Sequence, residues 1–109
     1  MRQGKVYNNN TLAGIIEETE NGEFVFRYIT NYFMDTKKPA ISITLPKNSQ
    51  KHFSRKLFSF FFNLLSEGEN RKLQSKVLKI DENDHFGLLL KTANEETIGA
   101  IRVVELIDN

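Results

Sequence analysis

The chain has 109 residues and a formal net charge of +1, with 39% hydrophobic and 27% charged residues. This length predicts a single domain over residues 1–109 and excludes a second core. The lack of cysteine excludes a disulfide framework and a thiolate metal site, and a balanced charge with scattered basic residues does not indicate a nucleic-acid binder. A polar start and short apolar runs predict a soluble, cytoplasmic protein.

The first third of the chain is predicted to form strands. Residues 5–7 and 11–16 are two short strands separated by a turn of three asparagines. Asn21-Gly22 is a strong hairpin signal, because both residues tolerate positive φ. A third strand follows at residues 23–28, and its alternation places three aromatic rings on one face: Phe24, Phe26 and Tyr28.

A fourth strand is predicted between the two prolines of the sequence. Residues 40–45 alternate apolar and polar side chains, so Ile41, Ile43 and Leu45 would share one face. The proline that follows, Pro46, is expected to end this amphipathic strand.

The middle of the chain has helical periodicity. From Ser54 to Gly68 the apolar residues recur at helical spacing and cover an arc of roughly 200°. Gly68 is predicted to end this helix. Phe58 and Phe62 lie at the edge of the arc, where burial and contact with a partner both stay open. The central seam is assigned to the core, under the later helices: Phe53, Leu57, Phe60 and Leu64.

Two more helices and a last strand complete the predicted elements. Residues 69–80 form a helix with one apolar stripe of Leu73, Val77 and Ile80. Asp84 is suited to cap a third helix, whose apolar residues are Phe86, Leu89, Leu90 and Ala93. Residues 98–107 return to strand. This order predicts an α+β fold, with a small, mostly antiparallel sheet packed against about three helices.

The sequence shows no motif for catalysis or for a cofactor, and no enzyme activity is expected. Its glycines are isolated, so no phosphate-binding loop is predicted. His52 and His85 lie far apart and lack partners at metal-ligand spacing, so we expect no metal site. The acidic pairs Glu17-Glu18 and Glu95-Glu96 are expected to be solvated.

Several segments resemble the N-terminal subdomain of HipA-type kinases. Residues 61–71, FFNLLSEGENR, are similar to the family pattern F-x-N-L-L-P-E-G-x-x-R. Residues 41–46, 84–89 and 97–103 are similar to its S-L-S-L-P, D-x-F-x-L-L and S-V-G-A-V-x-L segments, and Leu12-Ala13-Gly14 fits its V-G-x-L start. The order and spacing agree over nearly the whole chain.

The resemblance implies a binding protein, because the nucleotide-binding and catalytic residues of HipA kinases lie in lobes that follow this subdomain. The free-standing form is similar to the HipS-type antitoxins of three-gene HipBST toxin–antitoxin modules. It implies an antitoxin that neutralises a HipT- or HipA-like kinase, in a complex with a HipB-type helix-turn-helix protein. It implies no cofactor, membrane or direct nucleic-acid contact. Two alternatives stay open, an accessory subunit that completes a split kinase and a scaffold that bridges kinase and repressor.

The expected kinase-binding residues lie along the Phe-rich segment and the turn after it. Ser66 stands where the family has proline, which frees the turn to adopt another shape. The acidic turn is a candidate to enter the kinase's nucleotide cleft or approach its basic substrate surface. The alternative is an ordinary helix boundary, with Glu69 favoured by the helix dipole. Arg71 is expected to form a structural ion pair. The full set is Phe58, Phe62, Ser66, Glu67, Gly68, Glu69 and Arg71.

Overall fold

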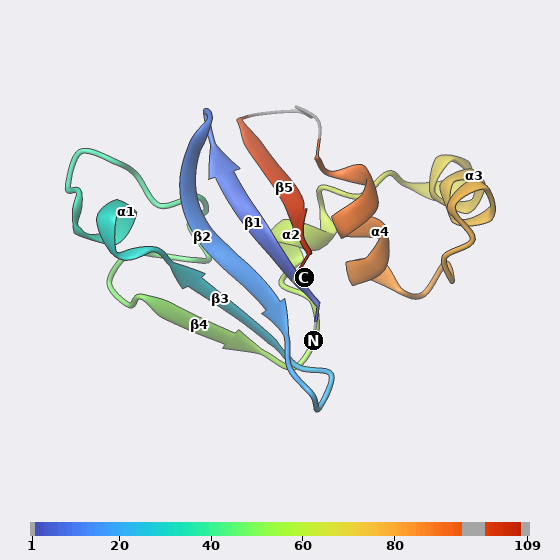
Figure 1. Cartoon of the computed structure of the whole chain (residues 1–109), viewed down its shortest axis with the longest axis horizontal. Coiled ribbons are helices and arrows are strands. Elements are labelled where there is room, and N and C mark those ends of the chain that lie inside the picture. Colours follow the sequence, from blue (N-terminus) through green and yellow to red (C-terminus); the bar gives the residue numbers. More distant parts are fainter. Residues whose placement is uncertain (1, 95–99, 108–109) are drawn as a thin grey trace.

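Five strands and four helices make up the part of the chain that the computed structural model describes, residues 2–94 and 100–107 (Figure 1). The strands are β1 (Gln3–Asn8), β2 (Thr11–Glu18), β3 (Phe24–Tyr28), β4 (Lys51–Ser54) and β5 (Ile101–Leu106). The helices are α1 (Thr30–Met34), α2 (Ser59–Phe62), α3 (Gly68–Leu78) and α4 (His85–Thr92). The strands form one antiparallel sheet in the order β4-β3-β2-β1-β5, which confirms the predicted α+β class.

The first three strands form where the sequence predicts them. Asn9 and Asn10 turn the chain between β1 and β2 with φ of 50° and 69°, a left-handed conformation that asparagine tolerates. Gly22 takes φ of 77° between β2 and β3. The three aromatic rings predicted to share one face of β3 are all buried: Phe24, Phe26 and Tyr28.

The core lies between one face of the sheet and three of the helices. Each of these helices places an aromatic ring against a ring of β3, an arrangement that buries large apolar area with favourable ring geometry. The pairs, with their centroid distances, are Tyr32–Tyr28 at 5.8 Å, Phe61–Phe26 at 5.7 Å and Phe86–Phe24 at 5.4 Å. The first belongs to α1, a short helix that the sequence pattern did not predict.

The fourth predicted strand, residues 40–45, is wrong. The segment forms no strand, and the hydroxyl of Tyr28 fixes it at two backbone positions. That oxygen accepts a hydrogen bond from the Ile41 amide at 3.0 Å and donates one to the Leu45 carbonyl at 2.5 Å. Ile41 and Leu45 are buried, whereas Ile43, which was expected on the same face, is 96% exposed.

The predicted helix from Ser54 to Gly68 is also wrong. Residues 51–54 form β4 at the edge of the sheet, where Phe53 pairs with Val25 and is 74% exposed instead of buried. Helix α2 covers only four residues, and Gly68 begins α3 with φ of 57° instead of ending a helix. Strand pairing with β3, a long-range contact, determines the backbone only of residues 51–54, so it explains why Phe53 and Ser54 are not helical. The rest of the predicted seam is half-buried against the core, namely Leu57, Phe60 and Leu64.

The later elements match their predictions. Asp84 caps α4, and its Oδ1 accepts a hydrogen bond from the Gly87 amide at 3.1 Å. Helix α3 spans almost all of the predicted range. Strand β5 runs antiparallel to β1. The predicted last strand began earlier, and the part of it at residues 98–99 lies outside the described residues.

Candidate partner-binding surfaces

Helix α3 extends away from the sheet at one end of the molecule (Figure 1). Among residues 68–78, none is buried. Two of the three residues of the predicted apolar stripe therefore do not cover the core, since Leu73 is 61% exposed and Val77 is 70% exposed, whereas Ile80, just beyond the helix, packs against the core. A pocket of about 380 Å³ lies between this side of α3 and the end of α4, and its lining residues are Leu73, Gln74, Val77, Leu78, Lys91, Thr92 and Asn94.

The turn of residues 66–69 leads directly into α3. Glu67, Gly68 and Glu69 are exposed, and the Glu69 side chain is 93% accessible. Glu67 occupies the N-cap position without a side-chain hydrogen bond to the helix. The first backbone amides of α3 therefore lack a side-chain cap there. Two acidic side chains, together with backbone amides that no side chain caps, make the turn a polar, accessible feature beside the apolar stripe.

Phe62 and Arg71 join the start of α3 to the body of the domain. The ring of Phe62 lies edge-on to the ring of His85 at 4.9 Å, and the Arg71 guanidinium lies over the same ring at 5.4 Å from its centroid. Arg71 was expected to form an ion pair. The structure instead gives it a cation–π contact, and its buried Nε has no hydrogen-bond partner among the described residues.

Phe58 lies apart from the other predicted site residues. It is the N-cap residue of α2 and packs edge-on against Phe61 at 6.1 Å. It also lines a pocket of about 270 Å³ beside β4, together with His52 and Phe53. The predicted site is therefore divided: Phe62, the turn and Arg71 lie at the α3 end, and Phe58 lies beside β4.

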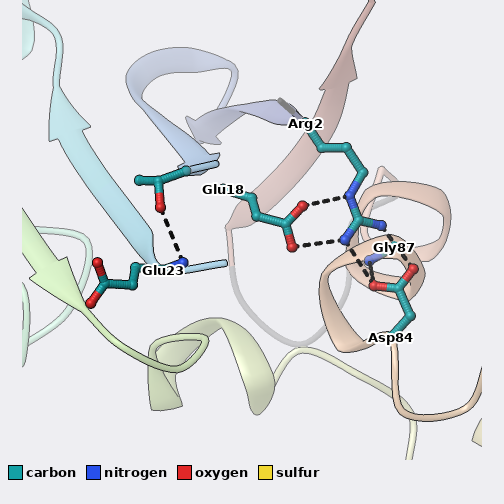
Figure 2. A network of polar contacts seen from close by, with 6 residues as sticks. Arg2, Glu18, Glu23, Asp84 and Gly87 are labelled. Carbon is teal, nitrogen blue, oxygen red and sulfur yellow. Dashed lines mark hydrogen bonds and ion pairs between the residues drawn. The ribbon is translucent and has the colours of Figure 1, made fainter. Parts of the chain in front are cut away.

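An ion-pair network that the sequence pattern did not reveal holds α4 against the sheet. Figure 2 shows Arg2 between two carboxylates, with hydrogen bonds to Glu18 at 2.9 and 3.0 Å and to Asp84 at 2.8 and 3.0 Å. The hydrogen bonds from Arg2 lower the pKa of Asp84, and the Gly87 amide contributes in the same direction. The same contacts raise the pKa of Arg2. Because both carboxylates are distant in sequence, only the fold brings them to Arg2.

The free edge of β4 is a second accessible surface. Its outward-facing residues, Lys51 and Phe53, are exposed. Phe53 lies between two pockets, one of about 270 Å³ and one of about 360 Å³ that extends toward Phe24, Val25 and Arg55. No part of the sequence analysis anticipated this surface, because Phe53 was assigned to the core.

Titratable groups do not gather into a metal site in the described part of the chain. The Nε2 atom of His52 lies 2.9 Å from the Pro46 carbonyl, and His85 packs on Phe62, so both histidines have structural contacts. Among residues 2–94 and 100–107, no helix has the length and apolar character needed to cross a membrane.

Two comparisons with known proteins, one with family models and one with solved structures, give the same family. A family model described as the HipA N-terminal domain matches residues 4–104. A solved structure titled "N-terminal domain of HipA toxin" is 26% identical, with a TM-score of 0.72, and the match covers 100% of this chain and 96% of that one. A search of curated proteins gave no match.

Proposed function

The chain belongs to the family of HipA N-terminal domains, and on this basis we propose that it is an antitoxin that binds and neutralises a HipA-type serine/threonine kinase toxin. It would act as a binding protein in a stoichiometric complex and not as an enzyme. The observation that supports a partner most strongly is α3, a helix whose apolar side chains have no role in the domain's own core.

Helix α3 has too little support within its own domain. It has 11 residues, and isolated helices shorter than about 12–15 residues are marginal in water. Most helices of this length are stabilised by packing an apolar face, yet Leu73 and Val77 face solvent. Exposed apolar clusters with a polar rim are typical of protein-binding sites. In the proposal, the kinase covers this stripe and supplies the missing packing.

The acidic turn provides the inhibitory part of the proposal. Glu67 and Glu69 are exposed immediately before the apolar stripe, so a partner bound to α3 would also contact the turn. Their carboxylates suit a basic surface such as the one that binds nucleotide phosphates or an acidic substrate. Blocking that cleft, or holding the kinase lobes in a non-productive arrangement, would neutralise the toxin.

Phe62 and Arg71 have a supporting role in this proposal. Their contacts with each other and with His85 position the first turn of α3 and thus the acidic turn. Ser66 replaces the family's proline within the same connection and allows it a different path. Phe58 lines the pocket beside β4, so a role for it in kinase binding requires an interface that extends around α2.

Co-expression of the chain with a HipA-type kinase from the same genome tests the proposal. We expect the chain to restore growth and to co-purify with the kinase. Co-purification without restored growth would contradict neutralisation and support an accessory subunit, or a scaffold if the complex also retains a HipB-type repressor. Absence of co-purification and of rescue would contradict the proposal itself.

Replacing the acidic turn separates binding from inhibition. The double variant Glu67→Ala, Glu69→Ala keeps the apolar stripe, so we expect complex formation to persist while protection of the cells weakens. Glu20→Ala is the matched control, since Glu20 is an exposed acidic residue in the turn between β2 and β3. Full protection by the double variant would exclude the turn as the inhibitory element.

A further inference from the structure

The charges of the chain are segregated, although its net charge is only +1. Residues 36–66 contain none of the 14 acidic residues and six of the 15 basic ones, so the scattered distribution expected from the sequence is wrong for this segment. The six are Lys37, Lys38, Lys47, Lys51, Arg55 and Lys56. The segment contains β4, and three of the six lie in that strand or directly after it. These three basic residues, Lys51, Arg55 and Lys56, are therefore concentrated at one edge of the sheet.

The register of β3 and β4 adds a second basic contact at this edge. Arg27 of β3 lies directly opposite Lys51 of β4, and both are exposed. Like charges at directly opposed positions of an antiparallel pair destabilise the sheet. Two acidic residues lie near this side of the strand pair: Glu23, which lines the 360 Å³ pocket, and Glu17 of β2, which lies opposite Val25. An anionic partner would relieve the repulsion between Arg27 and Lys51.

Phe53 gives the same edge an apolar component. It lies opposite Val25, next to the Arg27–Lys51 pair, and is 74% exposed between the two pockets. A lysine on an edge strand commonly serves to prevent unwanted strand pairing. Phe53 does not serve this protection, because an exposed aromatic ring favours association. The combination of Lys51 and Phe53 is instead suited to a specific partner.

The backbone of β4 can accept an additional strand. In an antiparallel pair, successive residues direct their amide and carbonyl groups alternately toward and away from the partner strand. The Gln50 carbonyl accepts a hydrogen bond from the Tyr28 amide, so alternate residues from Gln50 face β3. Lys51 and Phe53 therefore direct their backbone groups to the free edge, where the Lys51 carbonyl accepts a hydrogen bond from the Ser49 hydroxyl at 3.0 Å that an added strand would have to displace or share. Extended peptides bind to such edges through main-chain hydrogen bonds, with specificity from alternate side chains.

From these features we infer that the free edge of β4 binds an extended acidic segment of a partner protein as a sixth strand. Carboxylates of the segment face Arg27, Lys51 and Arg55, and an apolar side chain enters one of the two pockets that Phe53 lines. This surface lies along the edge of the sheet, away from α3, so both can be occupied at once (Figure 1). A single strand of nucleic acid fits less well, because it has no main-chain partners for the β4 backbone.

Binding of a designed peptide to the purified chain tests this inference independently of any kinase. The probe is a labelled peptide of alternating glutamate and valine, with a lysine–valine peptide and a thymidine oligonucleotide of equal length as comparisons. Of the three probes, we expect only the acidic peptide to bind, with a dissociation constant of about 1 mM or lower. Its affinity should fall as the salt concentration rises. Amide chemical shifts of residues 51–54 should change most.

Substitutions define the expected surface. Lys51→Glu and Phe53→Ala should each weaken binding of the acidic peptide about tenfold, and Lys76→Glu, on exposed α3, should leave it unchanged. Because all three positions are exposed, the folded state should persist, and circular dichroism checks this. Equal binding of the oligonucleotide would overturn the inference in favour of nucleic acid. Absence of peptide binding, or chemical-shift changes centred on α3, would overturn it outright.

Discussion

Helices α3 and α4 follow each other in the chain but have opposite relations to the core. Helix α4 has eight residues, and five of them are buried. Helix α3 has 11 residues, and among positions 68–78 none is buried. Both were predicted from helical spacing, and α4 also from its cap at Asp84. The comparison teaches that periodicity identifies a helix without showing whether its apolar side belongs to the core or to a partner.

The difference has a physical basis in the distribution of apolar residues. In α4 the consecutive residues Leu88, Leu89 and Leu90 are all buried, and Asp84 and Arg2 fix the start of the helix to the sheet. In α3 only Leu73, Val77 and Leu78 are apolar, the other residues are charged, polar or glycine, and the first turn is held by the Phe62–Arg71 contact. Helix α4 is therefore part of the core, whereas the apolar side chains of α3 remain exposed.

Truncating a leucine in each helix should separate the two roles most clearly. Leu89→Ala removes a fully buried side chain, so we expect the free energy of unfolding to fall by about 2–5 kcal/mol. Leu73→Ala acts on an exposed side chain, and the change should stay within about 0.5 kcal/mol. Urea denaturation measures both. Similar losses for the two variants would mean that α3 belongs to the core after all.

Hydrogen exchange in the free chain should show the same contrast without mutation. Amides of α4 are expected to exchange only through nearly global unfolding, because their helix is buried. Amides of α3 should exchange through local opening that costs far less free energy. Mass spectrometry or NMR can resolve the two segments. Equal protection of both helices would contradict the view that α3 needs a partner.

The cap of α4 should make the stability of the domain depend on pH. The Arg2 contact lowers the pKa of Asp84 below that of the unfolded chain, so the unfolded state binds more protons in this range. The stabilisation is complete above the unfolded pKa of about 3.9 and is lost as pH falls through the lower folded value. Because asparagine caps a helix about as well as aspartate, Asp84→Asn removes mainly the charge that pairs with Arg2, and the expected loss at neutral pH is at most about 1 kcal/mol.

The control for this prediction is the pH profile of the variant. Denaturation of Asp84→Asn should depend less on pH between about 5 and 2 than denaturation of the original chain. The two profiles should converge at the acidic end, where Asp84 is protonated. Parallel profiles would show that Asp84 does not carry the effect.

The smallest expected effect concerns the end of α3. Lys79 follows the helix with φ of 56°, a left-handed conformation that costs a lysine side chain about 1 kcal/mol. Lys79→Gly should therefore stabilise the end of α3 by up to about 1 kcal/mol, detected as slower hydrogen exchange in its last turn. Lys76→Gly, inside the helix, is the control and should have the opposite sign. Faster exchange in both variants would exclude relief of strain at Lys79.

Local signals in the sequence were sufficient for about half of the fold. The turn at Asn9-Asn10, the hairpin at Asn21-Gly22 and the Asp84 cap depend on residues close in sequence, and all three formed as predicted. The segments that were wrong depend on distant partners. Residues 40–45 are fixed by Tyr28, and residues 51–54 are paired with β3. Periodicity does not contain this information.

The candidate surfaces were less predictable than the fold. The turn 66–69 was singled out as a candidate to bind the kinase; residues 67–69 are exposed, and the role in kinase binding stays a prediction. Exposure of Phe53 and of the α3 stripe could not be derived, because both depend on which elements fail to cover them. The Arg2 network joins residues 16 and 82 positions apart, so its members have no relation in the linear sequence.

The affinity of the purified chain for its kinase, measured with the double variant Leu73→Ala, Val77→Ala, tests the central claim most directly. The control is Ile43→Ala, which truncates an apolar side chain outside α3 that is 96% exposed. We predict binding about tenfold or more weaker for the double variant, with unchanged stability and with normal binding by the control. Unchanged affinity of the double variant would contradict the assignment of α3 as the kinase-binding helix.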